Sequence, residues 1–216
     1  MVEISPESDA HMITTSGHLS QFPASTADHL AHYRHRIFIE RLCWQLPCSD
    51  GLEVDQFDRA DTIYVLARDE AGAIHGCARL LPTLRPYLLE QLFPDLLDGR
   101  PAPHSPKIWE LSRFASSSPS VTRSLLAATV ERAAREGAQR LLTISPLGVE
   151  RLLRRMGVHA QRAGAPVSMK GKKIFACWIE IDALTCFALR LDYRATLLHQ
   201  QSSEPGDLHE REHCGA

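Results

Sequence analysis

The segment Lys107–Ala115, which reads Lys-Ile-Trp-Glu-Leu-Ser-Arg-Phe-Ala, constrains the fold more than any other part of the chain. Its residues are mostly β-branched, aromatic or apolar, and it contains neither glycine nor proline, which predicts a β-strand. The strand nevertheless carries Glu110, Ser112 and Arg113. Because burying an unpaired charge is costly, the two charged side chains must lie on a solvent face or line a cleft. Residues three apart point to opposite faces of a regular strand, so a shared cleft requires a bulge or splay near Leu111-Ser112.

Composition is that of one soluble domain with an ordinary core: 216 residues, 44% hydrophobic and 23% charged. The net charge of −2 argues against a general nucleic-acid binder. Residues 121–183 carry a local charge of +6, which suggests an acidic partner or substrate, with a solvated helix face as the alternative. There is no apolar run long enough for a membrane span and no signal-peptide pattern, so we expect a cytoplasmic protein.

The six cysteines and eleven histidines do not form metal-binding motifs. No CxxC, paired metal spacing or HExxH is present, and the cysteines are interpreted as reduced thiols. We therefore predict no metal site. Residues 1–18 and 200–216 are polar and are predicted to be a mobile N-terminal extension and a polar C-terminal tail, which leaves 19–199 as the domain.

Hydrophobic periodicity and turn residues predict a helix over 28–42, then an acidic loop over 44–57. Strands are predicted at 62–67, 73–81, 107–115, 140–145 and 174–181, helices at 88–97, 121–136 and 149–156, and a final helix or strand–helix piece at 184–198. A hairpin at the front followed by alternating strands and helices predicts an α/β fold. We expect a single-domain α-β-α sandwich with a mixed central sheet.

Several polar and aromatic residues in the first half of the chain match the pattern of a known protein family in both type and spacing. The matching residues are Arg34, Phe38, Trp44, Glu53-x-Asp55-x-x-Asp58, Arg79-Leu80-Leu81-Pro82-Thr83 and Trp109-Glu110-x-Ser112-Arg113-Phe114. In these positions the chain resembles the acyl-homoserine-lactone synthases, the bacterial autoinducer synthase family. The resemblance covers about residues 33–181 and shows no departure at the family's hallmark residues.

The resemblance implies a two-substrate acyltransferase with an N-acetyltransferase-like fold and a cleft at a splayed or bulged central strand. S-adenosylmethionine supplies the amine, and a thioester on an acyl carrier protein supplies the acyl group. Amide formation is followed by lactonisation, which releases methylthioadenosine and an N-acyl-L-homoserine lactone, a quorum-sensing signal. S-adenosylmethionine is a substrate in this reaction, so no cofactor is expected.

The same resemblance assigns roles to the matching residues. Glu110 is the general base for the substrate ammonium, with a strand carboxylate paired to an arginine as the alternative. Ser112, Arg113 or a backbone N–H would stabilise the thioester oxyanion, and the sequence does not choose among them. The residues expected to bind S-adenosylmethionine are Arg34, Phe38, Trp44, Asp55, Asp58, Arg79 and Arg113.

Two kinds of interaction are expected within that binding set. Asp55 and Asp58 would form an anionic wall for the sulfonium while ion-pairing with arginines, and a solvated acidic loop is the alternative. Phe38 and Trp44 suit a wall that covers the adenine or the substrate, and plain hydrophobic packing is the alternative.

Later residues are assigned to the acyl chain and its carrier. The expected acyl pocket consists of Thr143, Ser145, Leu147 and Met156. Thr143 and Ser145 share one strand face, so a hydroxyl there could bond a 3-oxo or 3-hydroxy group, or simply bond the backbone. Carrier docking is assigned to Arg154, Arg155 and Lys172 on the basic surface. We expect a monomer or weak dimer, with no nucleic-acid or membrane partner.

Two other functions are compatible with the same fold. An acyl-CoA-dependent N-acyltransferase normally holds pyrophosphate on a glycine-rich loop that opens a helix. Here the corresponding stretch, 116–121, has no glycine, and Pro119 removes one N–H donor, which favours a carrier-borne donor. A non-catalytic S-adenosylmethionine sensor would be expected to lose Glu110, Arg113 or the acidic pair, and all of these are present.

Overall fold

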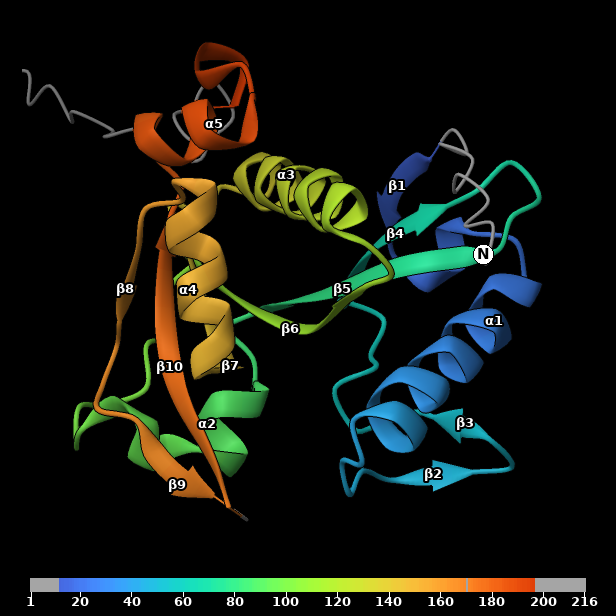
Figure 1. The fold of residues 1–216 in the computed structure, drawn as a ribbon, viewed down its shortest axis with the longest axis horizontal. Helices are drawn as coiled ribbons and strands as arrows, with labels where there is room; N and C mark the ends of the chain where they lie inside the picture. The colour runs from blue at the N-terminus through green and yellow to red at the C-terminus, as the bar shows by residue number, and fades with distance from the viewer. Residues whose placement is uncertain (1–11, 170, 197–216) are drawn as a thin grey trace, which may run out of the picture.

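The computed structural model describes residues 12–169 and 171–196. Within these residues an eight-stranded sheet has the order β1-β4-β5-β6-β7-β10-β8, with β9 paired to β10 (Figure 1). Its strands are β1 (Ile13–Gly17), β4 (Ile63–Arg68), β5 (Ile74–Pro82), β6 (Ile108–Ser116), β7 (Arg140–Pro146), β8 (Ala160–Arg162), β9 (Val167–Met169) and β10 (Lys172–Glu180). A separate hairpin pairs β2 (Cys48–Ser49) with β3 (Leu52–Glu53). The α-helices are α1 (Ser25–Arg34), α2 (Leu88–Leu92), α3 (Pro119–Arg135), α4 (Leu147–Met156) and α5 (Ala183–Leu189).

Helices cover both faces of the sheet, as predicted. Apolar side chains of α3 and α4, among them Leu125, Val130 and Leu153, form one core with alternate residues of the central strands. The opposite face carries two further clusters, one under α1 and one under α2. The described pairings are antiparallel apart from β6 with β7, which is parallel. The molecule is therefore a mixed-sheet α-β-α sandwich.

The N-terminal extension is where the sequence prediction was wrong. Residues 13–17 fall inside the segment predicted to be mobile, yet they form β1, an edge strand paired along its length with β4. This pairing is made by backbone hydrogen bonds, which a polar sequence can form as well as an apolar one. Residues 1–11 and the predicted tail at 200–216 lie outside the described residues.

Three predicted helices are also modified. The first begins at Ser25 and changes at His35–Arg41 into a π-helix, a form that is common at functional sites. The predicted helix at 88–97 is α2 followed by a 3-10 turn from Pro94, because a proline cannot continue the helical hydrogen bonding. The predicted final element at 184–198 is interrupted: α5 ends at Leu189, Arg190 follows in a left-handed conformation, and residues 193–196 are helical again.

Strand β6 contains the irregularity that the spacing of Glu110 and Arg113 requires. Cys77 of β5 lies opposite Ala115, but Arg79 lies opposite Ser112, so β6 carries one extra residue and forms a β-bulge. Arg113 adopts a φ of +51° at this point. The bulge turns the side chain of Arg113 to the same side of the sheet as Ser112, as its contacts below show, and confirms the prediction of an irregular strand.

A splay accompanies the bulge. Parallel pairing of β6 with β7 runs from Ile108 opposite Arg140 to Leu111 opposite Thr143 and stops there, although both strands continue. In Figure 1, β7 and β10 run away from β5 and the second half of β6. The sheet therefore opens directly beside the charged residues of β6.

Candidate active site

Six buried charged residues from four parts of the chain form a closed cluster, which we call the charge ring. Its members are Arg34, Glu53, Asp55, Asp58, Arg79 and Arg113. Each of these side chains is at most 5% exposed. The three positive and three negative charges cancel, which is the condition under which burial of so many ions is tolerable.

Charges alternate around the ring, so that each carboxylate bridges two guanidinium groups. Glu53 accepts from Arg34 at 2.5 Å and from Arg113 at 2.8 Å. Asp55 accepts from Arg113 at 2.7 Å and from Arg79 at 2.6 Å. The list is completed by Asp58, which accepts from Arg79 at 2.9 Å and twice from Arg34, at 2.7 and 3.0 Å. The predicted ion pairs of Asp55 and Asp58 with arginines are thus present.

Asp58 is the most heavily bonded member of the charge ring. Besides its bonds from the two arginines, it accepts a hydrogen bond from the Tyr64 hydroxyl at 2.5 Å and another from the backbone N–H of Asp55 at 2.8 Å. Burial by itself would raise the pKa of Asp58, but Arg34, Arg79 and Tyr64 together hold that pKa well below its usual range. Burial raises the pKa of the Tyr64 phenol, which therefore remains a donor.

Sequence reasoning missed Tyr64 and did not include Glu53 in the predicted site. Tyr64 lies in an apolar strand, where a tyrosine ordinarily signals packing, and its ring is indeed 1% exposed. Glu53 was part of the matching motif Glu53-x-Asp55-x-x-Asp58, and its place in that motif was the only clue to its role. Glu53 belongs to the charge ring and Tyr64 bonds one of its members, through contacts that join distant parts of the chain.

Phe38 and Trp44 lie against each other beside the charge ring. Their ring centroids are 5.0 Å apart and the planes differ by 25°, a stacked arrangement. After the π-helix the chain folds back toward Phe38, and the backbone N–H of Trp44 donates to the carbonyl of Phe38 at 2.8 Å. The guanidinium of Arg113 lies 5.7 Å from the Phe38 ring centre. Phe38 is 1% exposed, so it packs as core, and Trp44 is half-buried.

Glu110 is buried, at 1% exposure, and its partners are backbone groups rather than an arginine. Its two carboxylate oxygens accept the N–H groups of Leu88 and Leu89, both at 2.8 Å. Burial raises the pKa of Glu110 to about 7, although the two N–H groups and the nearby Arg79 and Arg113 favour the charged form. A carboxyl group with this pKa can accept and release a proton near neutral pH.

Ser112 and Arg113 share the face of Glu110 and are held by the charge ring. The Ser112 hydroxyl accepts from Arg79 at 3.0 Å, which leaves its own proton available to another acceptor. Arg113 is held by Glu53 and Asp55, and its carbonyl accepts the Cys77 thiol at 3.2 Å. The bulge, the hydroxyl and the guanidinium are therefore connected by one network of hydrogen bonds.

The four predicted acyl-pocket residues lie on the α3 and α4 side of the sheet. Thr143 and Ser145 are paired across the sheet with Cys177 and Phe175, which belong to that core. Leu147 and Met156 pack against the same core. Within residues 12–169 and 171–196, neither predicted hydroxyl makes a side-chain hydrogen bond, so no protein group competes for these hydroxyls. Leu147 and Met156 are the first and last residues of α4, so the four positions border this side of the sheet along the length of the helix.

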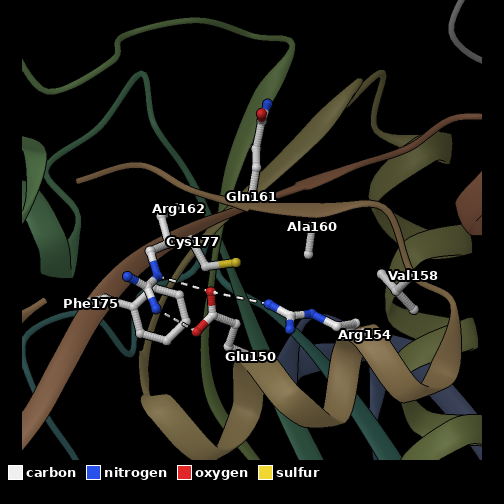
Figure 2. Close-up of a pocket in the computed structure, with 8 residues that line it drawn as sticks. All are labelled: Glu150, Arg154, Val158, Ala160, Gln161, Arg162, Phe175 and Cys177. Carbon is white, nitrogen blue, oxygen red and sulfur yellow. Dashed lines mark hydrogen bonds and ion pairs between the residues drawn. The ribbon is translucent and has the colours of Figure 1, made fainter. Parts of the chain in front are cut away.

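Figure 2 shows a pocket of about 90 Å³ beside these residues, which the sequence did not reveal. It lies between α4, β8 and β10, and the Cys177 thiol and the Phe175 ring face it. The carboxylate of Glu150 bonds Arg162 at 2.8 and 2.9 Å and lies 4.0 Å from Arg154. This ion pair and Phe175 close one side of the pocket.

The three predicted docking residues are exposed but do not form one patch. Arg154 and Arg155 lie in the last turn of α4. Lys172 is the first residue of β10, close to Ile174, and Ile174 pairs with Pro146 next to the start of α4. The Lys172 ammonium donates to the carbonyl of Leu42 at 3.3 Å. A ten-residue helix is about 15 Å long, so Lys172 is separated from the two arginines by roughly that distance.

Among the residues that the structure describes, no three or more His, Cys, Asp or Glu side chains are arranged to hold a metal ion. No described helix has both the length and the apolar character needed to cross a membrane. The five cysteines in the described part of the chain are free thiols.

Comparisons with known proteins show the family to which the chain belongs. The family model of the autoinducer synthases matches residues 19–189. An acyl-homoserine-lactone synthase of Ralstonia solanacearum is 53% identical over 172 residues, which are 74% of this chain and 84% of the relative. The crystal structure of TofI in a ternary complex with an inhibitor and MTA is 53% identical, with a TM-score of 0.79, and the match covers 84% of this chain and 98% of TofI.

Two further structures are more distant. BjaI, a CoA-dependent acyl-homoserine lactone synthase solved with SAM and isopentyl-CoA, is 27% identical with a TM-score of 0.76, over 84% of this chain and 88% of BjaI. Escherichia coli ElaA, at 15% identity and a TM-score of 0.56 over 77% of this chain and 99% of ElaA, shares the fold alone.

The fold and the site define an acyltransferase with an N-acetyltransferase-like sheet. The chain belongs to the autoinducer synthase family. Its enzymatic activity is that of an acyl-homoserine-lactone synthase, which makes quorum-sensing signals.

Proposed function

We propose that this synthase joins the amine of S-adenosylmethionine to an acyl group delivered as an acyl carrier protein thioester, then closes the lactone with loss of methylthioadenosine. The observation that carries this proposal is Glu110, a buried carboxyl with a pKa of about 7 at the point where β6 and β7 part. Two related structures, TofI with bound MTA and BjaI with bound SAM, support S-adenosylmethionine as the amine substrate.

Amide formation needs a base and an oxyanion stabiliser. Glu110 takes the proton of the substrate ammonium, directly or through water, and the freed amine attacks the thioester carbon. A C–N bond forms, the C–S bond breaks and the carrier thiolate takes up a proton. The Ser112 hydroxyl and the Arg113 guanidinium stabilise the negative oxygen, and because the charge ring fixes both, little reorganisation is needed.

Lactonisation uses the substrate's own groups. The methionyl carboxylate attacks its γ-carbon, the bond to the sulfonium sulfur breaks, and methylthioadenosine leaves as a neutral thioether. Asp55 and Asp58 are each bonded to two arginines, so the charge ring offers the sulfonium a fixed neutral wall rather than a free counter-charge. The half-buried face of Trp44, stacked on Phe38, supplies a cation–π surface for the sulfonium or a wall for the adenine.

The acyl chain is proposed to run between the sheet and α4. Thr143, Ser145, Leu147 and Met156 border this space on the side of the core that α4 covers. Thr143 and Ser145 are 6% and 7% exposed, and their hydroxyls can donate to an oxygen at carbon 3 of the acyl chain. Acyl length and carbon-3 oxidation state are the properties that product analysis would read.

An acyl carrier protein is the proposed donor because α3 begins at Pro119 after three serines, without the glycines of a pyrophosphate loop. Arg154 and Arg155 are proposed to dock its acidic surface, with Lys172 as a second, separate contact. An acyl-CoA donor is the second candidate, favoured by the CoA-dependent relative BjaI.

Incubation of the purified chain with S-adenosylmethionine and either acyl carrier thioester or acyl-CoA of the same length tests the proposal. Mass spectrometry should detect methylthioadenosine and N-acyl-homoserine lactone in equal amounts, with kcat/KM higher for the carrier thioester. Faster turnover of acyl-CoA would refute the carrier as donor. Acylated amine without methylthioadenosine would refute the lactone-forming reaction.

A further inference from the structure

The carboxylate of Glu110 makes an unusual pair of contacts with a distant part of the chain. Leu88 and Leu89 are the first two residues of α2, and their N–H groups donate to the two oxygens of Glu110, both at 2.8 Å. The first N–H groups of a helix have no partner within the helix and need one elsewhere. Tyr87, at the N-cap position, makes no side-chain capping bond. Glu110 therefore serves as the cap of α2 across 21 and 22 residues of sequence.

The surroundings of Glu110 leave these N–H groups as its only direct hydrogen-bond donors among the described residues. Its neighbours on the adjacent strands are Leu81 and Leu142, both apolar and buried. The charged groups that act on it are the guanidinium groups of Arg79 and Arg113, which pair with carboxylates inside the charge ring, and the phenol of Tyr87 lies within electrostatic range. The orientation of the carboxylate is thus determined by α2.

We propose that the backbone N–H groups of Leu88 and Leu89 are positioning groups for the general base, which makes the start of α2 part of the catalytic machinery. Each carboxylate oxygen has two acceptor positions, and each N–H occupies one of them. One position on each oxygen remains for the proton of the substrate. This inference rests on the proposed role of Glu110 in amide formation.

The contact also makes α2 sensitive to the protonation state of Glu110. A carboxylate accepts stronger hydrogen bonds than a neutral carboxyl group, so the N–H groups stabilise the ionised form. Loss of one of these charge-assisted hydrogen bonds removes part of that stabilisation, so it should raise the pKa of Glu110 by about 1 unit. The reciprocal effect is that α2 is held less firmly when Glu110 carries a proton.

The test replaces the Leu89 amide with an ester in the full-length chain, by incorporating the α-hydroxy acid analogue of leucine. This change removes the N–H donor and alters the shape of the backbone little. The matched control is the same change at Phe93, whose N–H donates to the carbonyl of Leu89 at 2.8 Å and so supports the same helix. Carbon-13 NMR of glutamate labelled at the side-chain carboxyl gives the titration midpoint of Glu110, and the Glu110→Gln variant assigns its resonance.

We expect the Leu89 ester to raise the midpoint from about 7 by about 1 unit, and the Phe93 ester to leave it unchanged. The single-turnover rate of amide formation should then fall about 8-fold at pH 6.5 and by less than about 1.5-fold at pH 9, because fewer Glu110 groups are ionised only at the lower pH. A purely structural weakening would lower both rates alike.

Two results would overturn the inference in different ways. Equal midpoints for the Leu89 and Phe93 esters would show that α2 does not tune Glu110, whatever the role of Glu110. A raised midpoint with an unchanged rate at pH 6.5 would show that Glu110 is tuned by α2 but is not the base, which refutes that part of the proposed function.

Discussion

Replacing Asp58 with asparagine should measure what holds the charge ring together. Asp58 accepts two hydrogen bonds from Arg34 and one each from Arg79, Tyr64 and the Asp55 backbone. Asparagine keeps the shape but is neutral and has one acceptor oxygen in place of two. The Asp58→Asn variant therefore leaves a net positive charge buried in a ring that was neutral.

The expected loss of stability follows from this uncompensated charge. Removing one partner of a buried ion pair costs about 3–5 kcal/mol, and a domain of this kind has a free energy of unfolding of about 5–15 kcal/mol. With a urea m-value of about 2–3 kcal/mol/M, the unfolding midpoint should fall by about 1–2 M. A large part of any lost activity would then reflect lost folding, so activity should be measured on the folded fraction.

Equilibrium urea unfolding, followed by tryptophan fluorescence and circular dichroism, gives the midpoint and m-value. The control is Glu131→Gln, which breaks a solvent-exposed pair with Arg135 on α3 and should change stability by less than about 0.5 kcal/mol. An Asp58→Asn variant within 1 kcal/mol of the wild type, at an unchanged m-value, would refute the reasoning.

The same pair of proteins has a defined pH dependence. The pKa of Asp58 is lower in the folded protein than its unfolded value of 3.8. Its stabilising contribution is therefore fully present above pH 3.8 and is lost as the pH falls toward the folded pKa. The stability difference between wild type and Asp58→Asn should be constant from about pH 5 upward and should narrow below about pH 4. A difference that widens in acid would contradict the assignment.

Three further predictions use other parts of the molecule. Glu110→Gln should retain S-adenosylmethionine binding in calorimetry but lower turnover about 10²–10⁴-fold, because the base is lost. Burial raises the pKa of Glu110 from 4.5 to about 7, so the free energy of unfolding of the wild type should decline by about 3 kcal/mol as the pH rises between those values. The free energy of unfolding of the variant should not show this decline. Gly164→Ala should cost about 1–3 kcal/mol in urea unfolding, because a Cβ atom there would lie 2.2 Å from the backbone oxygen of Leu96. Charge reversal of Arg154 and Arg155 together should raise KM for the carrier substrate several-fold at low salt and leave KM for S-adenosylmethionine unchanged.

Matched variants separate these effects from general damage. Gly148→Ala meets no atom within 4 Å and lies in α4, so it should be neutral or stabilising by about 1 kcal/mol. Lys172 lies in β10, near the end of α4 opposite to Arg154. The Lys172→Glu variant should therefore change KM for the carrier substrate less than charge reversal of the two arginines. An unchanged carrier KM in the double reversal would remove these residues from the docking surface.

The sequence by itself determined the class of fold and named most of the residues that the structure brings together in the charge ring. Alternating apolar periods defined the strands and helices, because they record which side of each element is buried. The spacing of Glu110 and Arg113 required an irregular strand, since side-chain alternation along a strand allows no other way to bring both to one side. The family pattern named five of the six members of the charge ring as site residues.

Tertiary structure alone decided which groups are partners. Strand β1 depends on backbone pairing with β4, which a short polar segment does not announce. Tyr64 bonds Asp58, and Leu88 and Leu89 bond Glu110, through contacts that depend on how the chain returns rather than on local composition. Hydrophobic periodicity encodes how deeply each side chain is buried. The identity of its hydrogen-bond partner is set only when distant segments pack, which is why the alternating charge ring and the capping of α2 by Glu110 emerged from the fold.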